Sequence, residues 1–269
     1  MPAMNTATKE PPLLALKGVS KRFGALEALT GVDFEVDAGE VVALVGDNGA
    51  GKSTLIKAIA GVQLCDEGTF SMRGAEVTIS SPKDATTLGI TTVYQDLALC
   101  DNLDIVSNLF LGHERFPKSA ARVAGYIDEI EMEKSSLKLL ESLSVTTITD
   151  VRAHVASLSG GQRQAVAIAR SLLGEPSVVL LDEPTAALGV VQTKQVLNLI
   201  RTLRERQLGV VIISHNLADV FDVADRIIVL RLGGRVATFD IHGVSAEDVV
   251  AAITGAEFGA APAELEEPS

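Results

Sequence analysis

The sequence of residues 41–53 is Val41-Val42-Ala43-Leu44-Val45-Gly46-Asp47-Asn48-Gly49-Ala50-Gly51-Lys52-Ser53. Its first five residues are apolar, which predicts a strand covered on both faces, as in a parallel sheet. Residues 46–53 follow the pattern of a phosphate-binding loop, in which a glycine and four residues precede Gly-Lys-Ser. Such a loop turns backbone N–H groups toward a phosphate, and the positive end of the next helix adds to the attraction. A chance glycine-rich turn is the alternative, but the strand before the loop and the helical pattern over 53–60 favour a nucleotide site.

The composition of the chain excludes several classes of protein. Its 269 residues carry 23 Lys and Arg against 35 Asp and Glu, and this net charge of −12 argues against sequence-independent binding to nucleic acid. Hydrophobic residues make up 47%, enough for a sizeable core in one large domain or two small ones. Cys65 and Cys100 are too few to staple a fold of this size, so we expect a reducing compartment.

The sequence carries no signal for a membrane span or for secretion. No apolar run approaches the ~18–20 residues that a span requires, and residues 1–12 lack a basic flank followed by an apolar stretch. We therefore expect a cytosolic protein, whose role at a membrane would depend on a partner.

Strand and helix patterns on both sides of the loop predict an α/β fold. Upstream, Val32, Phe34 and Val36 alternate with Asp33 and Glu35, which is the period of a half-buried antiparallel strand. Downstream, the pattern predicts a helix from 159 to about 173, a strand over 177–181, a helix over 190–207 and a strand over 210–214. Strands that alternate with helices imply a mostly parallel sheet with right-handed crossovers.

The chain is predicted to form one main domain with an insertion. Residues 97–158 have few strand signals and a helical stretch over 127–143, which predicts an inserted helical subdomain. We expect the domain to cover residues 13–256, between a flexible N-terminus at 1–12 and a disordered acidic tail at 257–269.

Two carboxylates end the predicted strand that precedes Pro184. Ligands of open α/β sheets bind at the carboxyl ends of the strands, so Asp182 and Glu183 would both face the phosphates. Asp182 is suited to hold Mg²⁺ through water, and Glu183 is suited to polarise an attacking water as general base. A solvated acidic turn is the alternative, and the nearby phosphate-binding loop makes it the weaker interpretation.

A second anion site is predicted at Leu158-Ser159-Gly160-Gly161-Gln162. It combines a serine hydroxyl, flexible glycine N–H groups and the start of a helix. Ser159 also fits an ordinary N-cap, and the two interpretations are compatible because a capped N-terminus can bind phosphate. The pentapeptide matches in full the signature of the ATP-binding cassette (ABC) ATPases, and the order of the motifs along this chain resembles that family.

The resemblance covers about residues 13–254, and it implies an ABC-type P-loop fold with an N-terminal antiparallel β subdomain. It implies that Phe23 stacks on adenine, that Gln95 contacts Mg²⁺ and the attacking water, and that His215 contacts the γ-phosphate. The catalytic residues would be Glu183, His215 and Gln95, and the Mg²⁺ ligands Ser53, Gln95 and Asp182. The ATP contacts would be Phe23, Gly46, Asp47, Asn48, Gly49, Ala50, Gly51, Lys52, Ser53 and Thr54, together with Ser159, Gly160, Gly161 and Gln162. The histidines at 113, 154 and 242 have no partners at metal spacing, and we expect them on the surface.

One segment departs from the pattern of the family. Many members carry Ser-Ala-Leu-Asp three residues after the general base, and that Asp spans the interface of the dimer. Here the sequence is Ala186-Ala187-Leu188-Gly189, so position 189 has no carboxylate. This departure leaves open how two subunits would communicate, although it does not affect nucleotide binding.

Residues 182–189 and 214–220 resemble most the ATPases of monosaccharide importers, of the fructose and ribose type, in the subset with a single cassette. The resemblance implies an ATP-hydrolysing subunit on the cytoplasmic face of the membrane. A second copy of the chain, permease subunits and, indirectly, a sugar-binding protein outside the cell would be its partners. The alternatives are a soluble ABC ATPase that acts as a clamp in translation or DNA repair, and a non-catalytic nucleotide sensor. One cassette, no heptad run and the net charge of −12 disfavour the clamp, and intact Glu183 and His215 disfavour the sensor.

Two further expectations concern partners. Residues 97–111 are rich in apolar side chains, and those outside the core would form an exposed patch, rimmed by Asp101 and Asp104, on which a permease docks. An acidic residue at position 161 is expected to repel the γ-phosphate held by a second copy.

Overall fold

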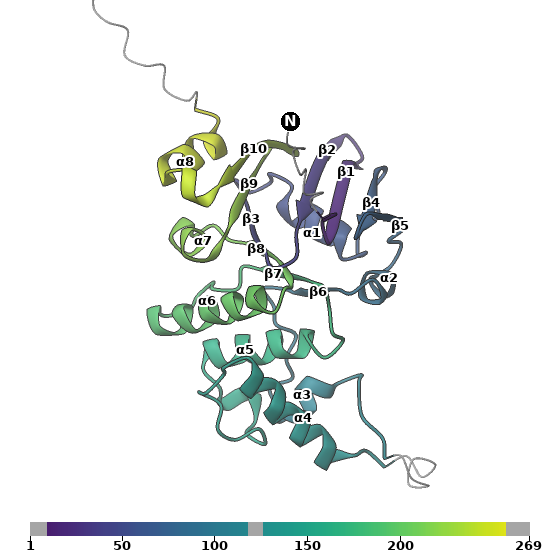
Figure 1. The fold of residues 1–269 in the computed structure, drawn as a ribbon, viewed down its shortest axis with the longest axis vertical. Helices are drawn as coiled ribbons and strands as arrows, with labels where there is room; N and C mark the ends of the chain where they lie inside the picture. Colours follow the sequence, from purple (N-terminus) through teal and green to yellow (C-terminus); the bar gives the residue numbers. More distant parts are fainter. Residues whose placement is uncertain (1–9, 118–125, 257–269) are drawn as a thin grey trace, which may run out of the picture.

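A six-stranded sheet forms the centre of the computed structural model, which describes residues 10–117 and 126–256 (Figure 1). In spatial order its strands are β10 (Gly234–Asp240), β9 (Arg226–Arg231), β3 (Val41–Val45), β8 (Gly209–Ile213), β7 (Val178–Asp182) and β6 (Ile90–Val93). Every pairing from β9 to β6 is parallel, and only β10 runs antiparallel. The mostly parallel sheet is therefore confirmed, and the observed strands at β3, β7 and β8 agree with the predicted ones to within one residue.

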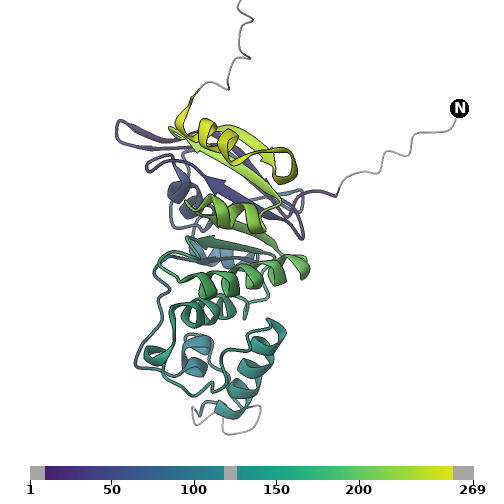
Figure 2. The ribbon, with the colours of Figure 1, turned by 90° about the vertical axis from the view of Figure 1, so that its left-hand side faces the viewer.

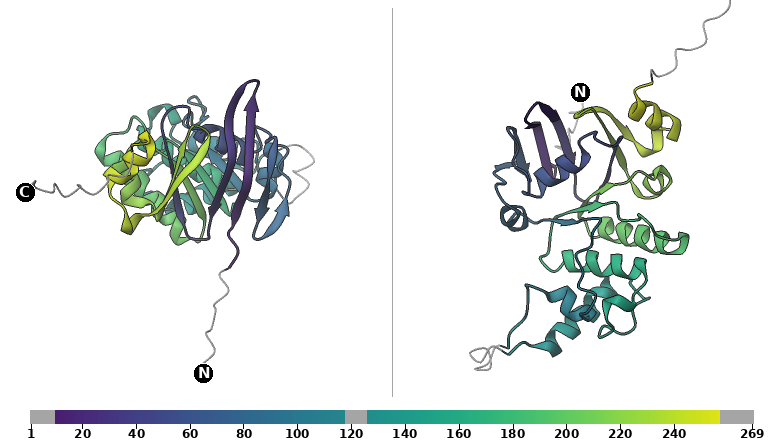
Figure 3. Two further views of the ribbon diagram at one scale, coloured as in Figure 1. Left: turned by 90° about the horizontal axis from the view of Figure 1, so that it is seen from above. Right: turned by 180° about the vertical axis from the view of Figure 1, so that it is seen from behind.

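The N-terminal subdomain is a four-stranded antiparallel sheet, as expected. Its strands, in order, are β2 (Leu26–Val36), β1 (Leu14–Phe23), β4 (Glu67–Met72) and β5 (Ala75–Val77). The side chains of Val32, Phe34 and Val36 are buried, because the alternation in β2 turns them toward the core. Seen from above, this sheet lies beside the central one (Figure 3, left).

Both faces of the central sheet are covered, which explains the continuous apolar runs. On one face, Val42 and Leu44 of β3 pack with α1 (Lys52–Ile59) and the antiparallel sheet. On the other face, Val41, Ala43 and Val45 pack against a second core that includes helices. Around the sheet lie α2 (Pro82–Thr87), α6 (Val190–Glu205), α7 (Leu217–Val223) and α8 (Ala246–Thr254).

Helices form the end of the molecule that lies beyond the edge strand β6 (Figures 1 and 2). They are α3 (Ile105–Phe110), α4 (Glu129–Ser142), the short 3₁₀ helix η2 (Val155–Ser157) and α5 (Gly160–Ser171). The first three lie within the predicted insertion at 97–158, and α5 packs on both α3 and α6. Residues 118–125 of that insertion lie outside the described residues, as do residues 1–9 and the predicted tail at 257–269. No helix in the described part of the chain is long and apolar enough to cross a membrane.

Candidate functional site

The phosphate-binding loop connects β3 to α1, as predicted, and two of its glycines have positions that no other residue fits. Gly46 has φ +150°, and a Cβ there would lie 2.1 Å from the backbone oxygen of Leu230. Gly51, at φ +104°, is the N-cap of α1, and its Cβ would lie 2.7 Å from the backbone oxygen of Ala28. The backbone of neighbouring segments therefore approaches the loop so closely at Gly46 and Gly51 that only glycine fits there.

The ammonium of Lys52 lies against the first residues of this loop. Its Nζ donates hydrogen bonds to the carbonyl oxygens of Gly46 (2.6 Å) and Asp47 (2.9 Å). Burial lowers the pKa of Lys52, and the carboxylates of Glu183, Asp47 and Asp182 oppose that shift. The amine thus has two weak neutral partners and is positioned to exchange them for the charged oxygens of a phosphate.

A cleft of about 400 Å³ gathers most of the predicted nucleotide residues. Those that line it are Phe23, Asn48, Gly49, Gly51, Lys52, Ser53, Thr54, Gln95, Asp182 and Glu183. Gly46, Asp47 and Ala50 complete the loop without lining the cleft. The ring of Phe23 is 46% exposed, with Lys21 Nζ 5.6 Å from its centroid, so Phe23 is not a core residue. Leu26, Glu27 and Ala28 also line the cleft, and sequence reasoning missed them although they directly follow the Gly24-Ala25 turn.

The two carboxylates lie at the carboxyl end of β7. Burial raises the pKa of Asp182, and the negative charge of Glu183 raises it further, against the lowering effect of Lys57 and Lys52. Burial and the neighbouring carboxylate both disfavour the charged form of Asp182. A cation bound beside Asp182 would therefore stabilise that charged form.

Glu183 and His215 meet, although 31 residues of chain separate them, because β7 and β8 are neighbours. Glu183 Oε2 lies 2.8 Å from His215 Nδ1, and the imidazole remains largely exposed. Glu183 has a left-handed backbone (φ +50°), and its N–H donates to the carbonyl of Ile213 at 3.0 Å. A non-glycine residue is strained in this conformation, and the hydrogen bond to Ile213 helps to hold Glu183 in it.

A buried hydrogen bond ties the loop after Glu183 to the helix after His215. The hydroxyl of Thr185 donates to Asp219 Oδ2 at 2.6 Å, and both residues are 9% exposed. Sequence reasoning missed this pair, because nothing in the spacing of 185 and 219 shows that they touch.

We expect Thr185→Val to lower the free energy of unfolding by about 1–3 kcal/mol, because the buried carboxylate of Asp219 loses this donor. Chemical denaturation measures the change. The same substitution at Thr238, which is exposed in β10, is the control and should have almost no effect. An unchanged midpoint for Thr185→Val would show that water replaces the hydroxyl at no cost.

The second predicted anion site lies on another surface. Ser159 caps α5, with its Oγ accepting from the N–H of Gln162, while Gln162 Oε1 accepts from the N–H of Ser159. Ser159 and Gln162 line an open hollow of about 490 Å³ with residues that begin α6, and no residue of the phosphate-binding loop lines it. Within one chain, the two predicted anion sites are therefore separate.

The expectation for position 161 is wrong in its geometry. Gly161 is buried against α6, and a Cβ there would lie 3.0 Å from Gln192 Cβ of the same chain. An aspartate at this position would push into α6, so it would disturb the packing of two helices and could not test repulsion alone. The surface positions expected for His113, His154 and His242 are confirmed, and the described residues contain no cluster of three His, Cys, Asp or Glu that could hold a metal.

Residues 29–186, more than half of the chain, match the family described as ABC transporter. This chain belongs to the ABC transporter family. It is similar to the fructose import ATP-binding protein FrcA of Rhizobium meliloti, at 45% identity over 92% of this chain and 96% of FrcA. It is 49% identical to the xylose/arabinose import ATP-binding protein XylG of Sulfolobus acidocaldarius, over 82% of this chain and 85% of XylG.

Solved ABC cassettes share the fold. An ATP-binding cassette of an ABC transporter in its ADP conformation superposes with a TM-score of 0.77 at 29% identity, over 91% of this chain and 99% of that one. A dimeric cassette in a post-hydrolysis state, bound to ADP and Pi, superposes with a TM-score of 0.69 at 26% identity, over 86% of this chain and all of that one. These matches confirm the ABC ATPase fold and an ATP-binding role for the chain.

Proposed function

We propose that this ABC ATPase energises a binding-protein-dependent importer of a monosaccharide, as a peripheral subunit on the cytoplasmic face of the membrane. The observation that carries the ATPase assignment is the single cleft that holds Lys52, Gln95, Asp182 and Glu183 together. The relatives named for import of fructose and of xylose and arabinose support a monosaccharide as the transported substrate. The chain covers 96% of the length of FrcA.

The residues of the cleft divide the chemistry among them. Phe23 offers its exposed ring to the adenine, and Lys52 with the loop N–H groups binds the phosphates. Glu183 accepts the proton of the attacking water, while His215 orients the carboxylate through its 2.8 Å contact. No covalent intermediate is needed, because positioning and charge neutralisation stabilise the transition state.

The same cleft fits Mg²⁺. Ser53, Gln95 and Asp182 offer it a hydroxyl, an amide oxygen and a carboxylate, which are the ligands that this cation prefers. With few carboxylates of its own, the site depends on the phosphate oxygens of ATP to complete the shell. Held by these residues, Mg²⁺ would supply positive charge that helps to neutralise the phosphates during hydrolysis.

Two copies of the chain would close head to tail over two ATP molecules, with each cleft covered by Ser159–Gln162 of the second copy. The separation of the two anion sites within one chain supports this arrangement, since a second copy can bring them together. The dimeric post-hydrolysis cassette offers a precedent at 26% identity.

The proposal is tested by coexpression with the permease subunits of sugar importers from the same genome. Capture through the permease should recover both proteins, and a binding protein loaded with fructose, xylose or ribose should stimulate ATP turnover. Failure of the chain to assemble with a correctly folded permease, together with recovery on ribosomes, would favour the clamp instead.

Permease docking is better assigned to a groove than to the predicted patch. Ile105, Val106, Leu109 and Phe110 are buried in the core, and Leu111 is the only large apolar side chain of residues 97–111 that is exposed. The two aspartates expected at the rim of the patch make contacts within the subdomain instead. Asp104 caps α3 and pairs with Arg152, and Asp101 pairs with Arg163 of α5. The predicted patch is therefore wrong, because α3 is buried at every position except Ser107.

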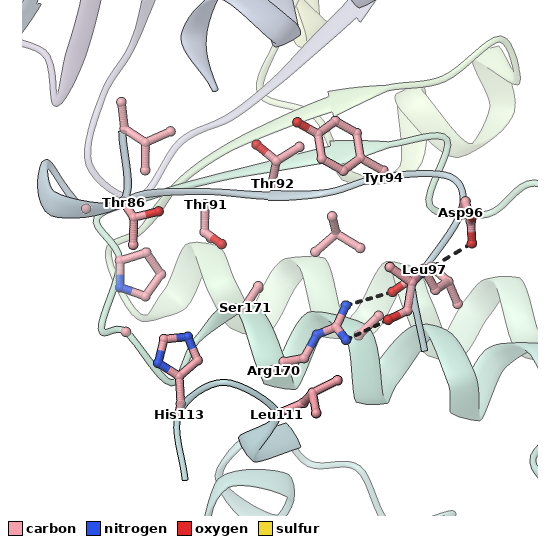
Figure 4. A pocket seen from close by; sticks show the side chains of 17 residues that line it. Thr86, Thr91, Thr92, Tyr94, Asp96, Leu97, Leu111, His113, Arg170 and Ser171 are labelled. Carbon is pink, nitrogen blue, oxygen red and sulfur yellow. Dashed lines mark hydrogen bonds between the residues drawn. The ribbon is translucent and has the colours of Figure 1, made fainter. Parts of the chain in front are cut away.

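A groove of about 280 Å³ lies beside Leu111 (Figure 4). Its walls are β6 with Tyr94 on one side and Arg170 and Ser171 of α5 on the other. Arg170 donates to the carbonyls of Leu97 (2.7 Å) and Ala98 (2.8 Å), which fixes the segment after Gln95 to α5. An occupant of this groove would touch both the strand that leads to Gln95 and the helix that begins at Ser159.

We expect Leu111→Glu to weaken association with the permease at least about tenfold while leaving basal ATP turnover unchanged, because a charge would have to be buried on docking. Leu137→Glu on α4 is the matched control, since both leucines are 47% exposed and Leu137 lies outside the groove. Capture of the chain on reconstituted permease at increasing concentration measures the effect. Equal capture of both variants would remove the groove from the interface.

A further inference from the structure

The hairpin that joins β9 to β10 lies against the phosphate-binding loop. β9 pairs in parallel with β3 and extends past the end of β3, so it passes the first residue of the loop. There the carbonyl oxygen of Leu230 would lie 2.1 Å from a Cβ on Gly46. The chain then turns back into β10 at Leu232 and Gly233, and neither of these residues lines the nucleotide cleft. The turn therefore contacts the loop from outside the cleft.

Gly233 connects this turn to the loop and also to the antiparallel sheet. Its N–H donates to the carbonyl oxygen of Ala50 at 3.2 Å, and its own carbonyl oxygen accepts from the N–H of Thr30 in β2 at 2.8 Å. Ala50 is buried, so water cannot easily replace the N–H of Gly233 as the partner of this carbonyl. One carbonyl of the phosphate-binding loop thus depends on a residue from a distant hairpin.

The hydrogen bond at Ala50 affects the direction of the next N–H in the loop. In a trans peptide unit the carbonyl and the N–H point in opposite directions, and the unit between Ala50 and Gly51 is trans. The carbonyl of Ala50 is directed toward Gly233, so the N–H of Gly51 is directed away from the hairpin, and Gly51 lines the cleft. Lys52 holds two carbonyls earlier in the loop, but the structure gives the carbonyl of Ala50 to Gly233.

We propose that Gly233 is a positioning residue of the ATP site, whose N–H holds the carbonyl of Ala50 and thereby directs the N–H of Gly51 toward the phosphates. The inference rests on the proposed binding of the phosphates by this loop, and it needs neither a second copy of the chain nor a sugar. Gly233 has a left-handed backbone (φ +81°), and a Cβ there would lie 3.1 Å from the carbonyl oxygen of Ala28 in β2. A side chain at this position would therefore strain the turn and move its N–H away from Ala50.

The test compares Gly233→Ala with Gly74→Ala, because the two glycines occupy matching turns. Both hairpins turn through two residues, with φ of +49° and +81° at 232–233 and of +51° and +81° at 73–74. A Cβ on either glycine would lie 3.1 Å from its nearest neighbour, but for Gly74 that neighbour is the side chain of Pro11. Thermal unfolding should therefore show similar losses of stability for the two variants. Titration with ATP should show an affinity about three- to tenfold weaker for Gly233→Ala, and changed less than about twofold for Gly74→Ala.

Two further measurements show whether the loop is the cause of the weaker binding. The KM for ATP should rise with the loss of affinity, while turnover at saturating ATP stays within about twofold, because bound phosphates restore the direction of the N–H groups. Without nucleotide, deuterium uptake by residues 46–53 should be faster in Gly233→Ala than in Gly74→Ala. A turn that contributed only to general stability would change neither quantity selectively.

Gly233→Asn and Gly74→Asn repeat the comparison where alanine prevents folding. Asparagine adopts a left-handed backbone more readily than alanine, and it still brings a Cβ toward β2. Equal ATP affinities of the two variants, in either pair, would overturn the proposal, and so would equal uptake of deuterium over residues 46–53. Wild-type affinity of Lys52→Ala would instead contradict the proposed phosphate site itself.

Discussion

Glu183→Gln should lower ATP turnover by about 10²–10⁴-fold while ATP still binds, because the amide keeps the shape of the side chain but cannot accept a proton from water. The substitution also removes the negative charge that raises the pKa of Asp182 beside it. Repulsion against the γ-phosphate falls with that charge, and its effect is largest in a closed, water-poor interface. The variant is therefore expected to accumulate as an ATP-stabilised dimer.

Light scattering after size exclusion, with and without ATP, measures the dimer, and phosphate release measures turnover. Glu175→Gln is a closely matched control, because Glu175 is exposed and shares the left-handed backbone of Glu183, at φ +49° against +50°. Any cost of placing an amide in that conformation should therefore appear in both variants. Near-wild-type hydrolysis by Glu183→Gln would show that another group takes the proton.

Lys52→Ala should weaken ATP binding by roughly 10–100-fold, since a charge-assisted contact of this kind contributes about 1.5–3 kcal/mol. The structure adds a second reason for the loss. Lys52 Nζ holds the carbonyls of Gly46 and Asp47 before nucleotide arrives, so its removal also loosens the loop. Titration with a fluorescent ATP analogue measures the affinity.

Lys57→Ala is the control for this substitution. Lys57 lies on the same helix and is exposed, and it acts on Asp182 only through its charge. We expect its removal to change the affinity less than about twofold. Equal affinities of Lys52→Ala and Lys57→Ala would mean that Lys52 contributes only to the general field of the helix.

Much of the site could be predicted because its motifs are local. A phosphate-binding loop is read from eight consecutive residues, and its strand and helix adjoin it in the chain. The same holds for Asp182 and Glu183 at the end of an apolar run, and for Ser159, which caps α5 as predicted. Only the resemblance to a family, and no local pattern, singled out Phe23, Gln95 and His215.

Contacts between segments that are distant in sequence could not be predicted from the sequence. The apolar side chains of 97–111 could line a core or a surface, and the packing of α3 decided for the core at Ile105, Leu109 and Phe110. Thr185 and Asp219 meet because β7 and β8 are neighbours, and this neighbourhood is a property of the sheet order.

By itself the sequence determined the cassette, its phosphate-binding loop and the pair of carboxylates at the end of β7, because each depends on residue types at short, regular spacing. Only the tertiary structure decided what lies against the glycines of the signature. The periodicity of α5 places Gly160 and Gly161 at its N-terminus, but it does not say that α6 and Leu188 lie against them. That information depends on how α5 packs against α6, which brings Gln192 within 3.0 Å of a Cβ placed on Gly161.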